Sequence, residues 1–174
     1  ITLMVLELSS FVALTDRLHQ GLLDHLLLTR AMVGRFPHLE AITSRNIQVD
    51  TSDVTYSGIS QGGIYGATLM ALSTDIRRGH LGVPGQNYSL LLHRSVDFVP
   101  FFAILKIVYP DARQQLVALE AAQCLWDRVD PVSYYRHIAQ EPFDGNEPHD
   151  VLLVSATGDW QVALVTNEIT ARSD

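Results

Sequence analysis

Apolar residues recur at helical spacing in several long stretches of the chain. The clearest stripe runs through residues 11–35, where Leu14, Leu18, Leu22 and Leu26 recur every fourth position and predict a long helix. Further helices are predicted over residues 61–75, 96–109, 111–127, 131–140 and 160–173. Pro110 and Pro131 separate consecutive helices, because proline cannot continue a helix from within.

Three short apolar runs lie between these helical stretches. Residues 54–58 (VTYSG) predict a short buried strand, and residues 80–85 (HLGVPG) predict a second strand. Residues 151–156 (VLLVSA) form a continuous apolar run, which is typical of a strand covered on both faces. Strands that alternate with helices predict an α/β fold with a mainly parallel sheet.

Composition limits the kinds of protein that this chain can be. Its 174 residues suit a single domain, residues 1–174, with 47% hydrophobic and 18% charged residues. A net charge of −7 argues against a nucleic-acid-binding surface, which needs clustered lysine and arginine. No apolar run approaches the roughly 20 residues of a membrane span, and residues 1–10 lack the features of a signal peptide.

The cysteine and histidine content predicts neither a metal site nor a cofactor. Cys124 is the single cysteine, so neither an internal disulfide nor a multi-cysteine metal site can form. Its helical spacing predicts a buried, inert thiol. No pair of histidines has metal-ligand spacing together with a third ligand.

The strongest chemical signal is the stretch Gly58-Ile59-Ser60-Gln61-Gly62, which matches the pattern Gly-x-Ser-x-Gly. It lies between a predicted strand and a predicted helix, as a nucleophile elbow requires. A sharp strand-to-helix turn strains the serine backbone, and small residues two before and two after it avoid clashes. The Ser60 hydroxyl would then be exposed, with the Gln61 amide at a helix N-terminus to stabilise an oxyanion.

Phosphate-binding loops are weaker interpretations of the same residues. A Walker loop needs lysine and then serine or threonine after its last glycine, whereas Ile64 and Tyr65 follow Gly63. In the dinucleotide-binding pattern, Gln61 would occupy the place of the first glycine. A nucleotide-binding domain is therefore disfavoured.

The stretches VTYSGISQGG and VLLVSATGDWQV resemble the α/β-hydrolase superfamily. This resemblance implies a serine hydrolase in which Ser60 is the nucleophile, Asp159 the orienting acid and Gln61 the oxyanion donor, with Gly58 and Gly62 as the elbow glycines. It also implies a helical cap-like insertion over residues 96–140, with an acyl pocket lined by Phe98, Phe101, Phe102 and Trp126. Three structural alternatives stay open. Ser60 could be an ordinary small residue of a tight turn, Asp159 could cap a helix near Trp160, and the phenylalanines could be ordinary core.

The chain departs from the family pattern at both ends. The triad order is serine, acid, histidine, yet no histidine follows Asp159. Only about 50 residues precede the motif, too few for the family's N-terminal strands. His80 is expected just before a strand. His149 is expected at the amino end of the last strand, whereas the reactive loops follow the carboxyl ends of parallel strands. We therefore expect a partial α/β-hydrolase-like domain that lacks those strands and the histidine-bearing segment.

Two functions remain open from the sequence. One is a serine esterase or related enzyme that acts on a small-molecule ester or acyl substrate, with its histidine supplied from outside this chain. The other is a non-catalytic α/β-hydrolase-like binding module. In either case the strand over residues 54–58 would have an unpaired edge, which predicts self-association or pairing with a complementary segment.

Overall fold

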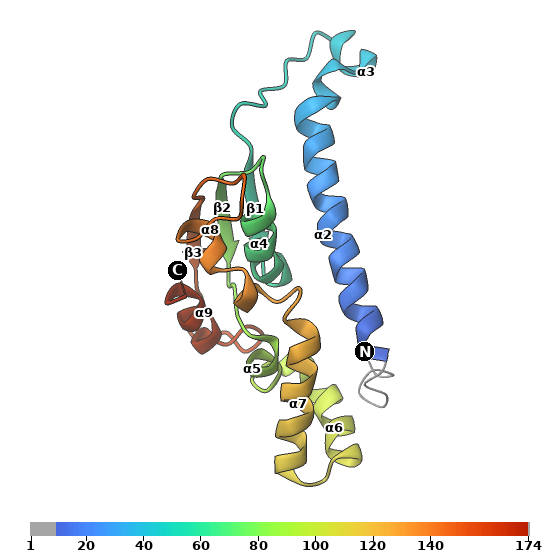
Figure 1. The fold of residues 1–174 in the computed structure, drawn as a ribbon, viewed down its shortest axis with the longest axis vertical. Helices are drawn as coiled ribbons and strands as arrows, with labels where there is room; N and C mark the ends of the chain where they lie inside the picture. The colour runs from blue at the N-terminus through green and yellow to red at the C-terminus, as the bar shows by residue number, and fades with distance from the viewer. Residues whose placement is uncertain (1–9, 174) are drawn as a thin grey trace.

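The computed structural model describes residues 10–173 and has an α/β fold around a small parallel sheet (Figure 1). The sheet contains β1 (Thr55–Ile59), β2 (Arg78–Gly82) and β3 (Asp150–Val154) in the order β1-β2-β3. Both pairings are parallel, and Ile59, Gly82 and Val154 stand in register at the carboxyl edge. The predicted α/β class with a parallel sheet is confirmed, whereas the interpretation of residues 1–9 lies outside the described residues.

The five longest predicted helices are present, whereas residues 131–140 form a 3-10 turn and a four-residue helix, and the short helices Glu40–Thr43 and Tyr88–Leu92 were not predicted. The helices are α2 (Phe11–Gly34), α3 (Glu40–Thr43), α4 (Gln61–Leu72), α5 (Tyr88–Leu92), α6 (Val99–Val108), α7 (Ala112–Trp126), α8 (Arg136–Ala139) and α9 (Leu164–Ala171), with short 3-10 turns η2 (Phe36–His38), η3 (Val96–Phe98) and η4 (Pro131–Ser133). The last helix starts later than predicted, because Asp159 holds the residues after it in a turn. None of the helices within residues 10–173 combines the length and apolar character that a bilayer-spanning helix requires.

The prediction that β1 and β3 are buried strands was wrong for one face of the sheet. Helices α4 and α8 cover the face that carries Tyr56 and Leu153. The opposite face, here called the open face, consists of Thr55, Ser57, Ile59, Arg78, His80, Asp150, Leu152 and Val154. Ile59 is 68% exposed and Leu152 is 62% exposed. An apolar run alone cannot reveal that none of the helices within residues 10–173 packs on one side of the sheet.

The side chains form two hydrophobic clusters. One lies between the sheet, α4 and α8, and its fully buried members include Met70, Leu81 and Tyr135. The other joins α2, α4, α5, α6 and α7 around Tyr88 and Trp126. The long helix α2 runs beside α4 and the end of α7 and does not cover the open face (Figure 1).

Helices α5, α6, α7 and α8 lie in the connection between β2 and β3, and α6 and α7 form a hairpin that projects away from the sheet (Figure 1). Asp130 anchors the base of this connection. Its carboxylate accepts hydrogen bonds from the amides of Tyr88 and Val132 and from the Gln123 side chain. Burial nevertheless raises the pKa of Asp130, because the desolvation of the charge outweighs these bonds.

Two further sequence expectations were wrong. Cys124 is exposed, because it lies on the solvent side of α7 while Gln123 and Trp126 face inward. His80 lies inside β2 rather than before it, since β2 begins at Arg78. Its ring Nδ1 lies 3.0 Å from the Ser57 hydroxyl across the open face.

Candidate active site

Ser60 is the single residue between the end of β1 and the start of α4. Its backbone angles are φ 56° and ψ −122°, in a region that non-glycine residues rarely adopt. Such a conformation costs on the order of 1–3 kcal/mol and persists only where the surroundings enforce it. The Ser60 side chain is exposed at the carboxyl edge of the sheet.

Close backbone packing enforces this turn. A Cβ atom on Gly58 would lie 2.3 Å from the carbonyl oxygen of Gly62, so only glycine fits there. A Cβ atom on Gly63 would lie 2.2 Å from the carbonyl oxygen of Gly82 in the neighbouring strand. Gly62 itself has room, since its Cβ would meet the Tyr56 hydroxyl at 3.6 Å. The motif had predicted Gly62 as the second glycine that the turn requires. The geometry instead requires glycine at position 63.

Hydrogen bonds fix the elbow from both sides. The Ser60 amide donates to the Gly82 carbonyl at 3.0 Å, which ties the turn to β2. The Tyr56 hydroxyl donates to the Gly62 carbonyl at 2.7 Å, which ties the first turn of α4 to β1. The Tyr56 contribution was not predicted, because nothing in the motif relates a strand tyrosine to the helix that follows.

Gln61 begins α4, so its amide is among the N–H groups that the helix cannot satisfy internally. Helix N-termini carry partial positive charge and favour a developing negative charge. The Gln61 amide therefore belongs to the residue directly after Ser60 and lies at the N-terminus of α4. The Gln61 side chain lines an adjacent cavity.

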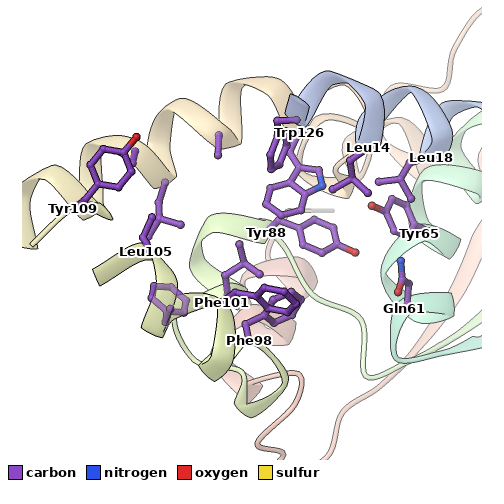
Figure 2. Close-up of a pocket in the computed structure, with 16 residues that line it drawn as sticks. Leu14, Leu18, Gln61, Tyr65, Tyr88, Phe98, Phe101, Leu105, Tyr109 and Trp126 are labelled. Carbon is purple, nitrogen blue, oxygen red and sulfur yellow. The ribbon is translucent and has the colours of Figure 1, made fainter. Parts of the chain in front are cut away.

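This cavity has a volume of about 160 Å³ and extends from the elbow along the α6–α7 hairpin (Figure 2). It brings together Gln61 and all four residues predicted for an acyl pocket, namely Phe98, Phe101, Phe102 and Trp126. The other lining residues are Phe11, Leu14, Leu18, Tyr65, Tyr88, Leu92, Leu105, Tyr109, Ala118, Leu119 and Ala122. Its walls are therefore mostly apolar, and the elbow lies at one end.

Three aromatic side chains with polar atoms line the elbow end of the cavity. The rings of Tyr88 and Trp126 stack with centroids 4.6 Å apart, and the rings of Tyr65 and Tyr88 lie 5.7 Å apart. The Tyr88 hydroxyl and the Trp126 indole nitrogen both lie on the side that faces Tyr65 (Figure 2). Burial raises the pKa of Tyr65 to about 12 and also raises the pKa of Tyr88, so both hydroxyls stay neutral.

The roles of Tyr65 and Tyr88 were missed by the sequence reasoning. Tyr65 lies four residues after Gln61 on α4, a spacing that places two side chains on one helix face and could have drawn attention to it. Tyr88 comes from α5, far along the chain, and no local signal relates it to the motif.

Asp159 lies in the loop after β3, beyond the same carboxyl edge of the sheet as Ser60. Its Oδ1 accepts hydrogen bonds from the amides of Gln161 at 2.7 Å and Val162 at 3.0 Å. Gln161 in turn donates to Asp97 at the start of the α6 region. Asp159 thus stabilises a turn rather than the start of a helix, and the carboxylate remains half-exposed.

No histidine within residues 10–173 forms a hydrogen bond with Ser60 or Asp159. His19, His137 and His149 contact the backbone carbonyls of Arg128, Glu141 and Met70, respectively. His25 and His93 pack against the rings of Tyr56 and Phe102, and His80 contacts Ser57. His38 lies in η2, beyond the far end of α2. The cavity is lined by Gln61, the residue after Ser60, and not by Ser60 itself, and no histidine among residues 10–173 lies beside the serine as a general base.

In the part of the chain that the structure describes, no three His, Cys, Asp or Glu side chains lie close enough together to hold a metal ion. Comparisons with protein-family models, with curated protein sequences and with solved structures each found no match. The geometry of the site is therefore the basis for inferring its function.

Proposed function

We propose that this protein is a serine acyl hydrolase of the α/β-hydrolase type, with Ser60 as the nucleophile. The observation that carries the proposal is the backbone of Ser60, which has φ 56° between a parallel strand and a helix. Tight turns tolerate such strain where it exposes a reactive group. The apolar cavity beside Gln61 supports the proposal, because an acyl group needs a place to bind next to the nucleophile.

In the proposed reaction, the Ser60 Oγ attacks the carbonyl carbon of an ester while a histidine takes the hydroxyl proton. The carbonyl oxygen becomes an oxyanion and accepts a hydrogen bond from the Gln61 amide. The alcohol leaves with the proton returned by the histidine, which leaves an acyl group on Ser60. Water then attacks the acyl carbon while the histidine takes its proton. The histidine returns that proton to the Ser60 Oγ, and the carboxylic acid is released.

The histidine of this mechanism comes from outside residues 10–173. Six of the described histidines have other contacts, and His38 lies in η2 beyond the far end of α2. Asp159 is the proposed acid that orients it. Asp159 follows β3 at the same sheet edge as Ser60, and its turn is held by two backbone amides. A fixed, half-exposed carboxylate is suited to accept the Nδ1–H of a histidine that approaches from solvent.

Labelling with a fluorophosphonate probe, with and without added imidazole, tests this proposal. Imidazole can act as the external base, so we expect labelling that increases with imidazole and is lost in Ser60→Ala. The control is Ser57→Ala, which removes an exposed serine from β1, three residues before Ser60. Labelling that persists in Ser60→Ala, or that is absent under both conditions, would contradict the role of Ser60.

A binding module without catalysis is the second candidate function, and the open face of the sheet favours it. β1 and β3 are both edge strands among the described residues, and Ile59, Leu152 and Val154 expose apolar side chains on that face. Exposed edges and apolar faces favour pairing with another chain. On this interpretation we expect self-association in light scattering, reduced by the double change Ile59→Lys and Leu152→Lys. A strictly monomeric species would count against it.

A further inference from the structure

Two apolar surfaces lack a partner among residues 10–173, one on the sheet and one on a helix. The first is the open face, where the side chains of Ile59 and Leu152 are exposed. The second is the solvent side of α2, which carries four large exposed side chains, namely Leu23, Leu27, Leu28 and Met32. We propose that α2 of one copy of this chain covers the open face of a second copy. This inference rests on the second candidate function, binding at the open face, and does not depend on the role of Ser60.

The first argument is that α2 is apolar on two sides. One side packs on α4 and α7 and buries Leu22. On the other side, Leu27 is 58% exposed and Leu28 is 59% exposed. A helix that is apolar around its circumference is normally covered all round. Because α2 lies at the outside of the molecule (Figure 1), its second apolar side has no cover in the described part of the chain.

The second argument is that a helix is the usual cover for a parallel sheet. Parallel sheets occur almost only with both faces covered, and helices supply the cover. The three strands stand about 4.8 Å apart, so the sheet is about 10 Å wide from β1 to β3. A helix with its side chains is about 10–12 Å in diameter. One helix is therefore wide enough to cover the open face.

The third argument is the position of two charges. Asp150 lies at the amino edge of the open face, and Arg35 follows the last residue of α2. Both are exposed, and neither forms an ion pair with another residue of the range 10–173. From Leu27 to Arg35 the helix rises about 12 Å, and from Val154 back to Asp150 the strand spans about 13 Å. If α2 runs antiparallel to the strands, Leu27 meets the apolar carboxyl edge while Arg35 meets Asp150.

The polar side chains in the middle of the open face already have partners, so covering them leaves few groups unsatisfied. The Ser57 hydroxyl and the His80 Nδ1 are 3.0 Å apart and share a hydrogen bond. Arg78 forms an ion pair with Asp53. Burial is costly for polar groups without a partner. Asp150 is the charge of this face that needs a partner from outside, and a basic residue on the covering helix supplies it.

Cross-linking between two cysteine variants tests the inference. Both variants use the full chain with Cys124→Ser, which removes its single cysteine. One copy carries Leu27→Cys, and the other carries Ile59→Cys together with a tag that increases its mass. A short bismaleimide links thiols that lie near each other, and a gel separates the three possible products. In the matched control, Val117→Cys on the exposed side of α7 replaces Leu27→Cys. All three positions are exposed, so the variants leave the buried core intact.

We expect the mixed product, which joins position 27 to position 59, to form at least about tenfold faster than the control product. Docking of α2 on the open face raises the local concentration of the two thiols. A predominant product between two Leu27→Cys chains would mean that α2 packs on α2, and it would overturn the inference. A predominant product between two Ile59→Cys chains would also overturn it, but would retain the open face as a binding surface. If no product exceeded the control, the inference would fail; association in light scattering would then still support the second candidate function, and a monomer would reject both.

Reversal of the two charges tests the orientation of the helix. Arg35→Glu on the Leu27→Cys chain should slow the mixed product at least about threefold, because it places two carboxylates together. Asp150→Arg on the Ile59→Cys chain should restore the rate when both reversals are combined. A rate that neither reversal changes would overturn the pairing of Arg35 with Asp150 and with it the antiparallel orientation.

Discussion

Gly63 in α4 lies so close to Gly82 in β2 that a Cβ atom on Gly63 would be 2.2 Å from the Gly82 carbonyl oxygen. The same carbonyl accepts the Ser60 amide at 3.0 Å. One backbone group of β2 therefore limits how the helix after the elbow can pack and also fixes the turn that strains Ser60. The elbow depends on this contact between neighbouring elements as much as on its own motif.

Gly63→Ala should destabilise the protein by about 2 kcal/mol or more, because the methyl group would force α4 away from β2. Gly62→Ala is the matched control, since a Cβ there meets nothing closer than 3.6 Å. We expect it to change the free energy of unfolding by less than about 1 kcal/mol. Urea denaturation of both variants measures the difference, and equal effects would contradict the packing argument.

Ser60→Gly should be more stable than Ser60→Ala by about 1 kcal/mol, because glycine adopts φ 56° without strain whereas alanine does not. Both variants remove the hydroxyl, so the comparison isolates the backbone. The free energies of unfolding from denaturant titrations give the result. If the alanine variant were as stable as the glycine variant, Ser60 would not be strained.

Asp130→Ala should destabilise the protein by about 3 kcal/mol, because it leaves the buried amides of Tyr88 and Val132 and the Gln123 side chain without their acceptor. Asp144→Ala, in an exposed loop, should stay within about 0.5 kcal/mol of the parent. Thermal and urea unfolding measure both variants. Similar stabilities would mean that Asp130 does not anchor the helical connection between β2 and β3.

The pKa of His93 is lowered from its ordinary value by burial and by the neighbouring charge of Arg94. The folded protein therefore binds the His93 proton less readily than the unfolded chain does, and stability is lost as the pH falls below about 6.5. His93→Gln should weaken the dependence of the free energy of unfolding on pH between about pH 7.5 and 5. His38→Gln serves as the matched removal of an exposed histidine. If the free energy of unfolding changed with pH equally in the His93→Gln variant and in the parent, the lowered pKa of His93 would be contradicted.

Much of the local structure follows from sequence-local rules. The stripe of Leu14, Leu18, Leu22 and Leu26 predicts α2, because helical periodicity places these side chains on one face. The motif around Ser60 predicts a turn between strand and helix, because glycine at position 58 is required by contacts only a few residues away. Such features need no information about distant parts of the chain.

The sequence by itself thus determined the α/β class, the long helices and the position of the turn at Ser60, because these follow from patterns among residues that are close along the chain. Only the tertiary structure decided that β1 and β3 leave one face open, that Cys124 is exposed and that Gly63 must be glycine. It also decided that Tyr88 and Trp126 stack beside Gln61 in one cavity. Exposure and cavity shape depend on which elements pack against a surface, and residues far apart in sequence set that packing.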